Sequence, residues 1–258
     1  MKTIIDRFGF EIEGEFSNGF SDDIRANNLG VMKGDGSVHA CGSYDSGTTG
    51  YDKEAHGRAS LSSGEFNSRP FYFGRMGEME EAKKVLDTFK AAAKAKRYHW
   101  NISAGMHVHV SFHPIKPPEL YSLEFSQYFE KLLKQNFPVE YKLRKGNRFC
   151  GVIQDEQQIA KPRDRYRFIN YTQSNHKTIE FRFFPANEPE KMWGYLQFTL
   201  NAISEFLLLG LEKKIVEEIE LGDTIGDAEV ANDTMRVKGR VRKYYKEEIP
   251  KLEIEYTL

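Results

Sequence analysis

The sequence predicts an α+β fold with a mainly antiparallel sheet. Three separated stretches alternate apolar residues with Glu, His or Arg, as strands with one apolar face do: Phe8 to Phe16, Met106 to Phe112 and Thr178 to Phe184. Segments with helical periodicity separate them irregularly, and half-polar strands favour antiparallel pairing. We expect residues 1–214 to form one domain and residues 215–258 a C-terminal appendix packed on it.

The first strand is predicted close to the N-terminus, where apolar residues of Phe8 to Phe16 alternate with acids such as Glu11 and Glu13. Residues 17–63 change character and are rich in Gly, Ser and Asp. This composition predicts a mobile insertion, with its most loop-like part at residues 42–57.

Three helices are predicted further along the chain. Residues Glu78 to Lys96 are dense in Ala, Lys and Glu, with apolar residues at helical spacing. A second helix is expected at Glu119 to Gln135, after two prolines, and a third from Pro189 to about Lys214 with a broad apolar stripe. Residues 149–184, between the second and third helices, are expected to be rich in strands.

Composition narrows the class of protein. The 258 residues are 40% hydrophobic and 13% aromatic, enough for a substantial core. A net charge of -1, from 37 basic and 38 acidic residues, gives no overall attraction to nucleic acid or to a membrane. Cys41 and Cys150 fit no metal-binding spacing, and no secretory leader is evident. We therefore expect a cytoplasmic protein with small-molecule partners, and the oligomeric state stays open.

The polar residues of the predicted strands are the candidates for chemistry. Glu is a poor strand former, so repeated Glu and His on one strand face need a reason. Carboxylates with one or two imidazoles suit Mg²⁺ or Mn²⁺, and an Arg two residues after a ligand Glu can hold a phosphoryl oxygen. The candidates are Glu11, Glu13, Glu65, His107, His109, Glu180 and Arg182. Together they indicate metal-assisted phosphoryl transfer.

Simpler interpretations stand beside this one. Any one of these strands, taken alone, is better explained by a solvated polar face, and Glu15 by a solvated rim position. The alternating Arg163, Arg165 and Arg167 would also suit a solvated basic edge strand. A basic run at residues 236–246 is explained by a charged helix face rather than by nucleic-acid binding. The coincidence of several polar strands is what favours a shared site.

The motifs resemble the glutamine synthetase-like carboxylate-amine ligases and, within them, the compact amidoligase family. Four blocks carry the resemblance, in the order of the family and over about 175 of the 258 residues. They are Gly9-Phe10-Glu11-Ile12-Glu13, Gly64-Glu65-Phe66-Asn67-Ser68-Arg69-Pro70, Gly105-Met106-His107-Val108-His109-Val110-Ser111 and Thr178-Ile179-Glu180-Phe181-Arg182-Phe183. The chain lacks the separate N-terminal domain of the large synthetases, so their ring and ammonia site are not carried over.

The resemblance implies a curved sheet whose concave face holds ATP and Mg²⁺ or Mn²⁺, with helices on the convex face. The metal ligands it implies are Glu11, Glu13, Glu65, His107 and Glu180. Its implied nucleotide or phosphate contacts are His109, Ser111, Asn170, Arg167 and Arg182. Arg167 and Arg182 would stabilise charge on the transferring phosphoryl group, although Arg163 or Arg165 could take the place of Arg167.

The implied activity is an ATP-dependent ligation that forms an amide or isopeptide bond through an acyl phosphate. Its substrates would be amino acids, peptides or other small carboxylates and amines, and the sequence does not identify them. Two alternatives stay open: a small-molecule kinase of the same fold, and a non-catalytic module that binds nucleotide or metal. Closure of the loop at residues 42–57 would protect an acyl phosphate from water.

Overall fold

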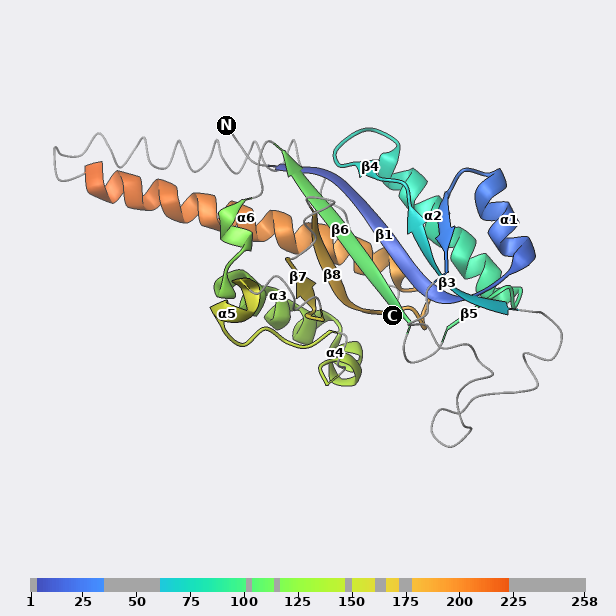
Figure 1. Cartoon of the computed structure of the whole chain (residues 1–258). Helices are drawn as coiled ribbons and strands as arrows, with labels where there is room; N and C mark the ends of the chain where they lie inside the picture. Colours follow the sequence, from blue (N-terminus) through green and yellow to red (C-terminus); the bar gives the residue numbers. More distant parts are fainter. Residues whose placement is uncertain are drawn as a thin grey trace.

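The computed structural model describes residues 4–34, 61–100, 104–113, 117–146, 150–160, 166–171 and 178–222. Within these residues the protein is α+β, with an open, curved sheet of eight strands and helices packed against it (Figure 1). All pairs between the named strands are antiparallel, and a single parallel bridge joins Gly151 to Arg167. The predicted fold class is therefore confirmed at this level.

The sheet has the strand order β2-β3-β1-β6-β8-β7, and two short strands, β4 and β5, also pair with β1. The strands are β1 (Ile4–Ser17), β2 (Gly30–Lys33), β3 (Leu61–Ser68), β4 (Phe71–Tyr72), β5 (Tyr98–His99), β6 (Gly105–His113), β7 (Ile169–Asn170) and β8 (Thr178–Pro185). Strands β1, β6 and β8 coincide with the three alternating stretches of the sequence. They lie next to one another at the centre of the sheet.

The helices are α1 (Asn18–Ala26), α2 (Glu78–Lys94), α3 (Leu123–Asn136), α4 (Pro138–Arg144), α5 (Glu156–Ala160) and α6 (Met192–Gly222), with a 3₁₀ turn η1 at Pro118–Leu120. The three predicted helices correspond to α2, α3 and α6. Helix α6 does not end near Lys214 but continues to Gly222, so it runs past the predicted end of the domain.

One face of the sheet, here called the aromatic face, forms the core. The ring of Phe181 on β8 packs on Phe125 and Phe129 of α3, and Phe89 of α2 packs on rings from β1 and β3. Burying such a side chain contributes about 1.5–3 kcal/mol. The strand residues of this face are Phe8, Phe10, Ile12 and Phe16 on β1, Phe66 on β3, Met106, Val108 and Val110 on β6, and Ile179, Phe181 and Phe183 on β8. The opposite side is called the polar face.

Helix α1 was not predicted, because residues 17–63 were expected to form a mobile insertion between short strands. The Ser17 hydroxyl accepts a hydrogen bond from the backbone N–H of Phe20 at 3.2 Å and thus caps the helix. Phe20 and Ile24, four residues apart, are buried on the same side. Residues 42–57 lie outside the described part of the chain.

The expectation of many strands at residues 149–184 was wrong in part. Within the described residues of this section, only β7 and β8 are strands, and α5 is a short helix whose first turn is capped by Asp155. Helix α4 was also missed. Pro138 stops α3 and begins a new helix, because proline suits a first helical position but cannot continue a helix.

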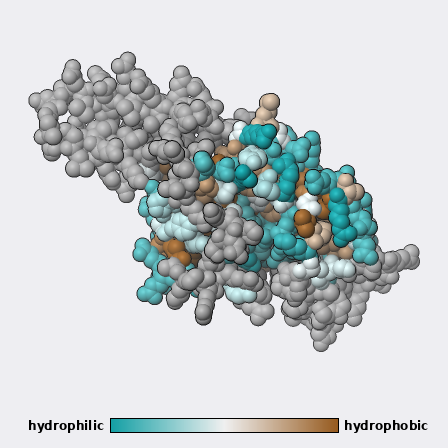
Figure 2. Space-filling model, turned by 45° about the horizontal axis from the view of Figure 1, so that its top comes forward, coloured by the Kyte–Doolittle hydropathy of each residue, from teal (hydrophilic) through white to brown (hydrophobic). Residues whose placement is uncertain are grey.

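The surface agrees with a core confined to the interior. On the face seen in Figure 2, the described residues are mainly hydrophilic, and hydrophobic residues form small, separate patches. In the described ranges, no helix is both long enough and apolar enough to cross a bilayer.

Candidate metal centre

The register of the strands brings acids and imidazoles together on the polar face. Glu11 of β1 is paired with His107 of β6, and His109 of β6 with Glu180 of β8. Neighbouring residues on adjacent strands have side chains that meet on the same side of the sheet. The polar positions of three strands therefore form one continuous row.

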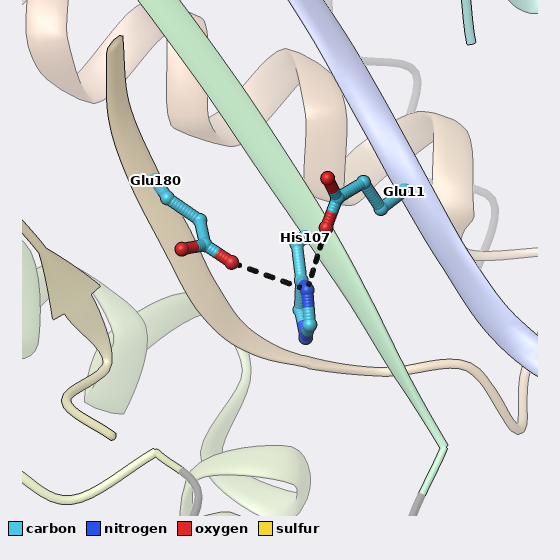
Figure 3. Close-up of side chains that lie close together, drawn as sticks. All are labelled: Glu11, His107 and Glu180. Atoms are coloured by element: carbon cyan, nitrogen blue, oxygen red, sulfur yellow. Dashed lines mark hydrogen bonds and ion pairs between the residues drawn. The ribbon is translucent and has the colours of Figure 1, made fainter. Parts of the chain in front are cut away.

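Glu11, His107 and Glu180 form the centre of this row (Figure 3). His107 Nδ1 lies 3.2 Å from a Glu11 carboxylate oxygen and 3.3 Å from a Glu180 oxygen, so both acids point at the same nitrogen. One ligand atom from each residue lies within 4.8 Å of the other two. Two carboxylates and an imidazole are donors that Mg²⁺ and Mn²⁺ accept, so the group fits the cation implied by the sequence.

His109 extends the site beside Glu11. Its Nε2 faces Glu11 Oε1 at a distance of 3.2 Å. Its Nδ1 lies 3.4 Å from the Thr178 hydroxyl. Burial alone would lower the pKa of His109, but the hydrogen bond and charge of Glu11 outweigh burial and raise it. Glu11 is thus the anionic group that this nitrogen faces.

The carboxylate of Glu11 is held in its charged form. Burial by itself would raise its pKa, but His107 and His109, through hydrogen bonds and charge, lower the pKa far below 4.5. A carboxylate that stays charged at all ordinary pH values is a suitable cation ligand.

Glu180 is fully buried and oriented by two neighbours. Asn170 of β7 donates its side-chain amide to one carboxylate oxygen at 2.6 Å, and Arg182 donates Nη1 to the other at 2.6 Å. Such partners fix the direction of a ligand side chain and tune its charge. Asn170 and Arg182, both expected at the site from the sequence, therefore contact Glu180 directly.

Glu13 and Glu15 continue the row on β1. Glu13 Oε1 lies 3.7 Å from His107 Nε2, and its other oxygen accepts the backbone N–H of Gly105 at 2.7 Å. Glu15 was expected to be a solvated rim residue, but its exposed fraction is 1%. That expectation was wrong because β5 pairs with β1 here, with His99 opposite Glu15, and covers a position the sequence pattern placed at the edge.

Glu65 lies on the other side of β1. It is paired with Glu13 across β1 and β3 and is hydrogen-bonded by the amide of Asn67 at 2.6 Å. Its pKa is raised, first by burial and then by the negative charge of Glu11, against the lowering effect of Asn67. Lys33 of β2 binds the other end of Asn67 at 3.4 Å. Glu65 thus neighbours the central group but is not one of its three members.

A pocket of about 520 Å³ opens next to the central group. Glu11 and His109 form its border with the cluster, and Ser111 and Thr178 line the wall along β6 and β8. The other charged residues of the lining are Lys33, Arg7 and Asp6, and Arg7 pairs with Asp6 at 3.4 Å. The Ser111 hydroxyl donates to the carbonyl of Arg7 at 3.3 Å. The volume and mixed lining of the pocket suit a small organic ligand bound beside the central group.

Arg167, two residues before β7, is placed by a hydrogen bond from Nη1 to the carbonyl of Val152 at 3.2 Å. Its proposed contact with phosphate stays a prediction. Arg163, Arg165 and the basic run at residues 236–246 lie outside the described residues.

Sequence reasoning missed three residues next to the cluster. Lys33 and Asn67 orient Glu65, and Arg144 lies behind β8. Asn67 stands in the second sequence block, two residues after Glu65, and this period-two spacing was a usable signal. The sequence gives no such signal for Lys33 and Arg144. Each lies on a short element, and only the packing of that element brings the side chain to the site.

A scan against protein-family models finds no match, and a search of curated proteins finds none either. The assignment of a function therefore depends on the geometry of the site and on the sequence motifs.

Proposed function

We propose that this protein is an ATP-dependent carboxylate-amine ligase with a glutamine synthetase-like fold and a requirement for Mg²⁺ or Mn²⁺. The observation that carries the proposal is the convergence of Glu11, His107 and Glu180, from three adjacent strands, next to a pocket of about 520 Å³. Mutually repelling carboxylates in one place are costly, and a bound cation is a physical reason to keep them.

The residues divide into holders of the cation and contacts of the anionic substrate. Glu11, His107 and Glu180 would hold the cation, with Glu13 and Glu65 beside them. The cation, when bound, neutralises phosphate charge. His109 lies at the border of the pocket and would contact the nucleotide there.

Arg182 would stabilise the transferring phosphoryl group. A guanidinium has five N–H donors, so an Arg182 that binds Glu180 through Nη1 can still donate to a phosphoryl oxygen. Because Glu180 fixes its position, the guanidinium needs little reorganisation as charge develops. Arg167 would assist from the β7 side.

In the proposed reaction, a carboxylate oxygen of the acid attacks the γ-phosphorus of ATP, and ADP leaves. The amine nitrogen then attacks the carbonyl carbon of the acyl phosphate, phosphate leaves, and the nitrogen loses a proton. No nucleophile from the protein is required. The contribution of the chain is to align the groups and exclude water.

The test is release of ADP and phosphate from ATP with pooled amino acids and small peptides, in the presence of Mg²⁺ or Mn²⁺. We expect wild type to turn over and Glu180→Ala and Arg182→Ala to lose at least about 100-fold in rate. Glu80→Ala, an exposed change on α2, is the control and should retain full activity. Equal rates in all four proteins would refute the assignment of the site.

The mass of the product separates the ligase from the related kinase. An amide of the acid and the amine, formed with one ADP and one phosphate, supports ligation. A stable phosphorylated acid without amide would assign a kinase, and tight ATP binding without turnover on any amine would assign a non-catalytic module.

A further inference from the structure

Arg144, the last residue of α4, is a buried guanidinium that binds the backbone of two central strands. Its exposed fraction is 7%. It donates Nε–H to the carbonyl of Phe183 at 3.0 Å, Nη2–H to the carbonyl of Arg182 at 3.3 Å and Nη1–H to the carbonyl of Ala104 at 3.5 Å. The first two carbonyls belong to β8, and the third directly precedes β6.

The carbonyls on β8 lie at a β-bulge. Met106 is paired with Phe184, and Val108 with Phe181. One residue of β6, His107, therefore stands opposite two residues of β8, Arg182 and Phe183. A bulge disrupts the ladder and leaves backbone groups unpaired. Arg144 donates to the carbonyls of these same two residues.

The bulge has a visible effect on side chains. Phe183 and Phe184 are consecutive residues of a strand, yet both are fully buried in contact with core rings. Regular alternation would put one of them on the polar face. The extra residue lets β8 bury both rings and still present Glu180 and Arg182 beside His107. Buried carbonyls at such a position need donors, because an unpaired one costs about 1–3 kcal/mol.

Helix α4 is itself anchored, so the backbone of Arg144 is held in place. Glu140, one turn before Arg144, is buried and accepts from Lys191 at 2.7 Å and from the Tyr195 hydroxyl at 3.3 Å. Lys191 precedes α6 and Tyr195 lies within it. The buried side of α4 thus attaches to α6 through Glu140 and to β8 through Arg144.

We infer that Arg144 is a positioning residue that clamps the β8 bulge opposite His107 and thereby sets where Glu180 and Arg182 stand at the cation site. Its guanidinium fork bridges the two β8 carbonyls and the start of β6, which the single ammonium of a lysine cannot do. The part of this inference that concerns the cation depends on the proposed function. The clamp on the backbone does not.

The first experiment measures amide hydrogen–deuterium exchange of wild type, Arg144→Gln and Arg144→Lys without added metal. We expect both variants to lose protection in residues 178–185 while protection in residues 61–68 is retained. Phe20→Leu is the control. It removes packing among the rings of Phe16 and Phe89, remote from β8, and should lower overall stability without a selective loss in β8.

The second experiment measures Mn²⁺ binding by electron paramagnetic resonance on the same four proteins. We expect an affinity about 10- to 100-fold weaker in Arg144→Gln, the range for loss of a group that orients metal ligands, with incomplete recovery in Arg144→Lys. Phe20→Leu should bind as wild type does.

The outcomes separate the two proposals. Unchanged protection of β8 in folded Arg144→Gln, or full recovery by Arg144→Lys, would overturn the clamp. Should Arg144→Gln fail to fold, the comparison of Arg144→Lys with Phe20→Leu decides, because only a clamp makes the loss selective for β8. Selective loss in β8 with no Mn²⁺ binding by wild type would support the clamp and refute the cation site.

Discussion

The two faces of the central strands differ in what they are built to do. On the aromatic face, rings from β1, β3 and β8 are covered by α2 and α3 and are almost fully buried. On the polar face, strands β1, β6 and β8 hold Glu11, Glu13, His107 and Glu180 within a few ångströms of one another. The first arrangement stabilises the fold, whereas the second is held in place by it.

This difference explains why the chain has so many phenylalanines in its strands. Clustered carboxylates repel one another and so lower the stability of the fold. Aromatic residues favour the extended conformation, so they can be placed in strands at little conformational cost. A large apolar contribution on one face offsets an unfavourable arrangement on the other. Functional sites commonly lower stability, and the rest of the protein offsets this. Changes on the aromatic face should therefore lower stability, whereas changes on the polar face should mainly lower cation binding.

The largest effect is expected on the aromatic face. Phe181→Ala removes a ring that contacts Phe125 and Phe129, and we expect the free energy of unfolding to fall by about 3–5 kcal/mol. Denaturation in guanidinium chloride measures this change. Met76→Ala, at a residue with an exposed fraction of 99%, should change stability by less than about 0.5 kcal/mol. A small effect of Phe181→Ala would mean that this face is not the main source of stability.

The next largest effect is expected on the polar face and in binding rather than in stability. Glu11→Gln keeps the size of the side chain but removes one of the two carboxylates that point at His107 Nδ1. We expect Mn²⁺ affinity to fall by about 100-fold, while the free energy of unfolding at pH 8 without metal changes by less than about 1.5 kcal/mol. Calorimetric titration and denaturant unfolding measure the two quantities. A loss of stability as large as that of Phe181→Ala would erase the distinction between the faces.

The sequence predicted most of this contrast, because period-two alternation reports both faces of a strand at once. Glu11, His107, His109 and Glu180 were therefore placed on a common face from the sequence alone, and the structure brings them together. Helix α4 and the bulge of β8 were not predicted. Helix α4 was missed although Pro138 marks the place where one helix ends and the next begins. The bulge depends on the register between β8 and β6, which the sequence of β8 alone does not define.

A smaller effect is expected at Gly105, the first residue of β6, which lies beside the site. A Cβ added at Gly105 would lie 3.1 Å from His107 Nε2, 3.2 Å from Arg144 Nη2 and 3.3 Å from Glu13 Oε2. We expect Gly105→Ala to weaken Mn²⁺ binding by about 3- to 10-fold, because side chains that orient the ligands must shift. Gly194→Ala in α6, where a Cβ meets nothing within 4 Å, is the matched control and should leave binding unchanged. Equal affinities in both variants would show that the space at Gly105 is not needed.

The last effect is the pH dependence of stability in the metal-free protein. The pKa of Glu11 is lowered in the folded state, so its contribution is complete above its ordinary value of 4.5 and is lost as the pH falls. The pKa of His109 is raised, so its contribution is complete below 6.5 and is lost as the pH rises through the higher folded value. We therefore expect maximal stability between these two values, with a loss of stability as the pH falls below 4.5 and another as it rises above 6.5.

Urea unfolding in EDTA across this pH range measures the profile, and Glu11→Gln should flatten it. Saturating Mn²⁺ should move the maximum of stability to higher pH. The cation binds the neutral imidazole, and protons compete with it for the same nitrogen, so Mn²⁺ stabilises the protein more as the pH rises. Ionisation of the imidazoles therefore stabilises the protein in EDTA and weakens the stabilisation by Mn²⁺. A profile that does not move with Mn²⁺ would mean that the acids and imidazoles of the polar face pair only with one another and bind no cation. The polar face would then have no function to set against the stabilising role of the aromatic face.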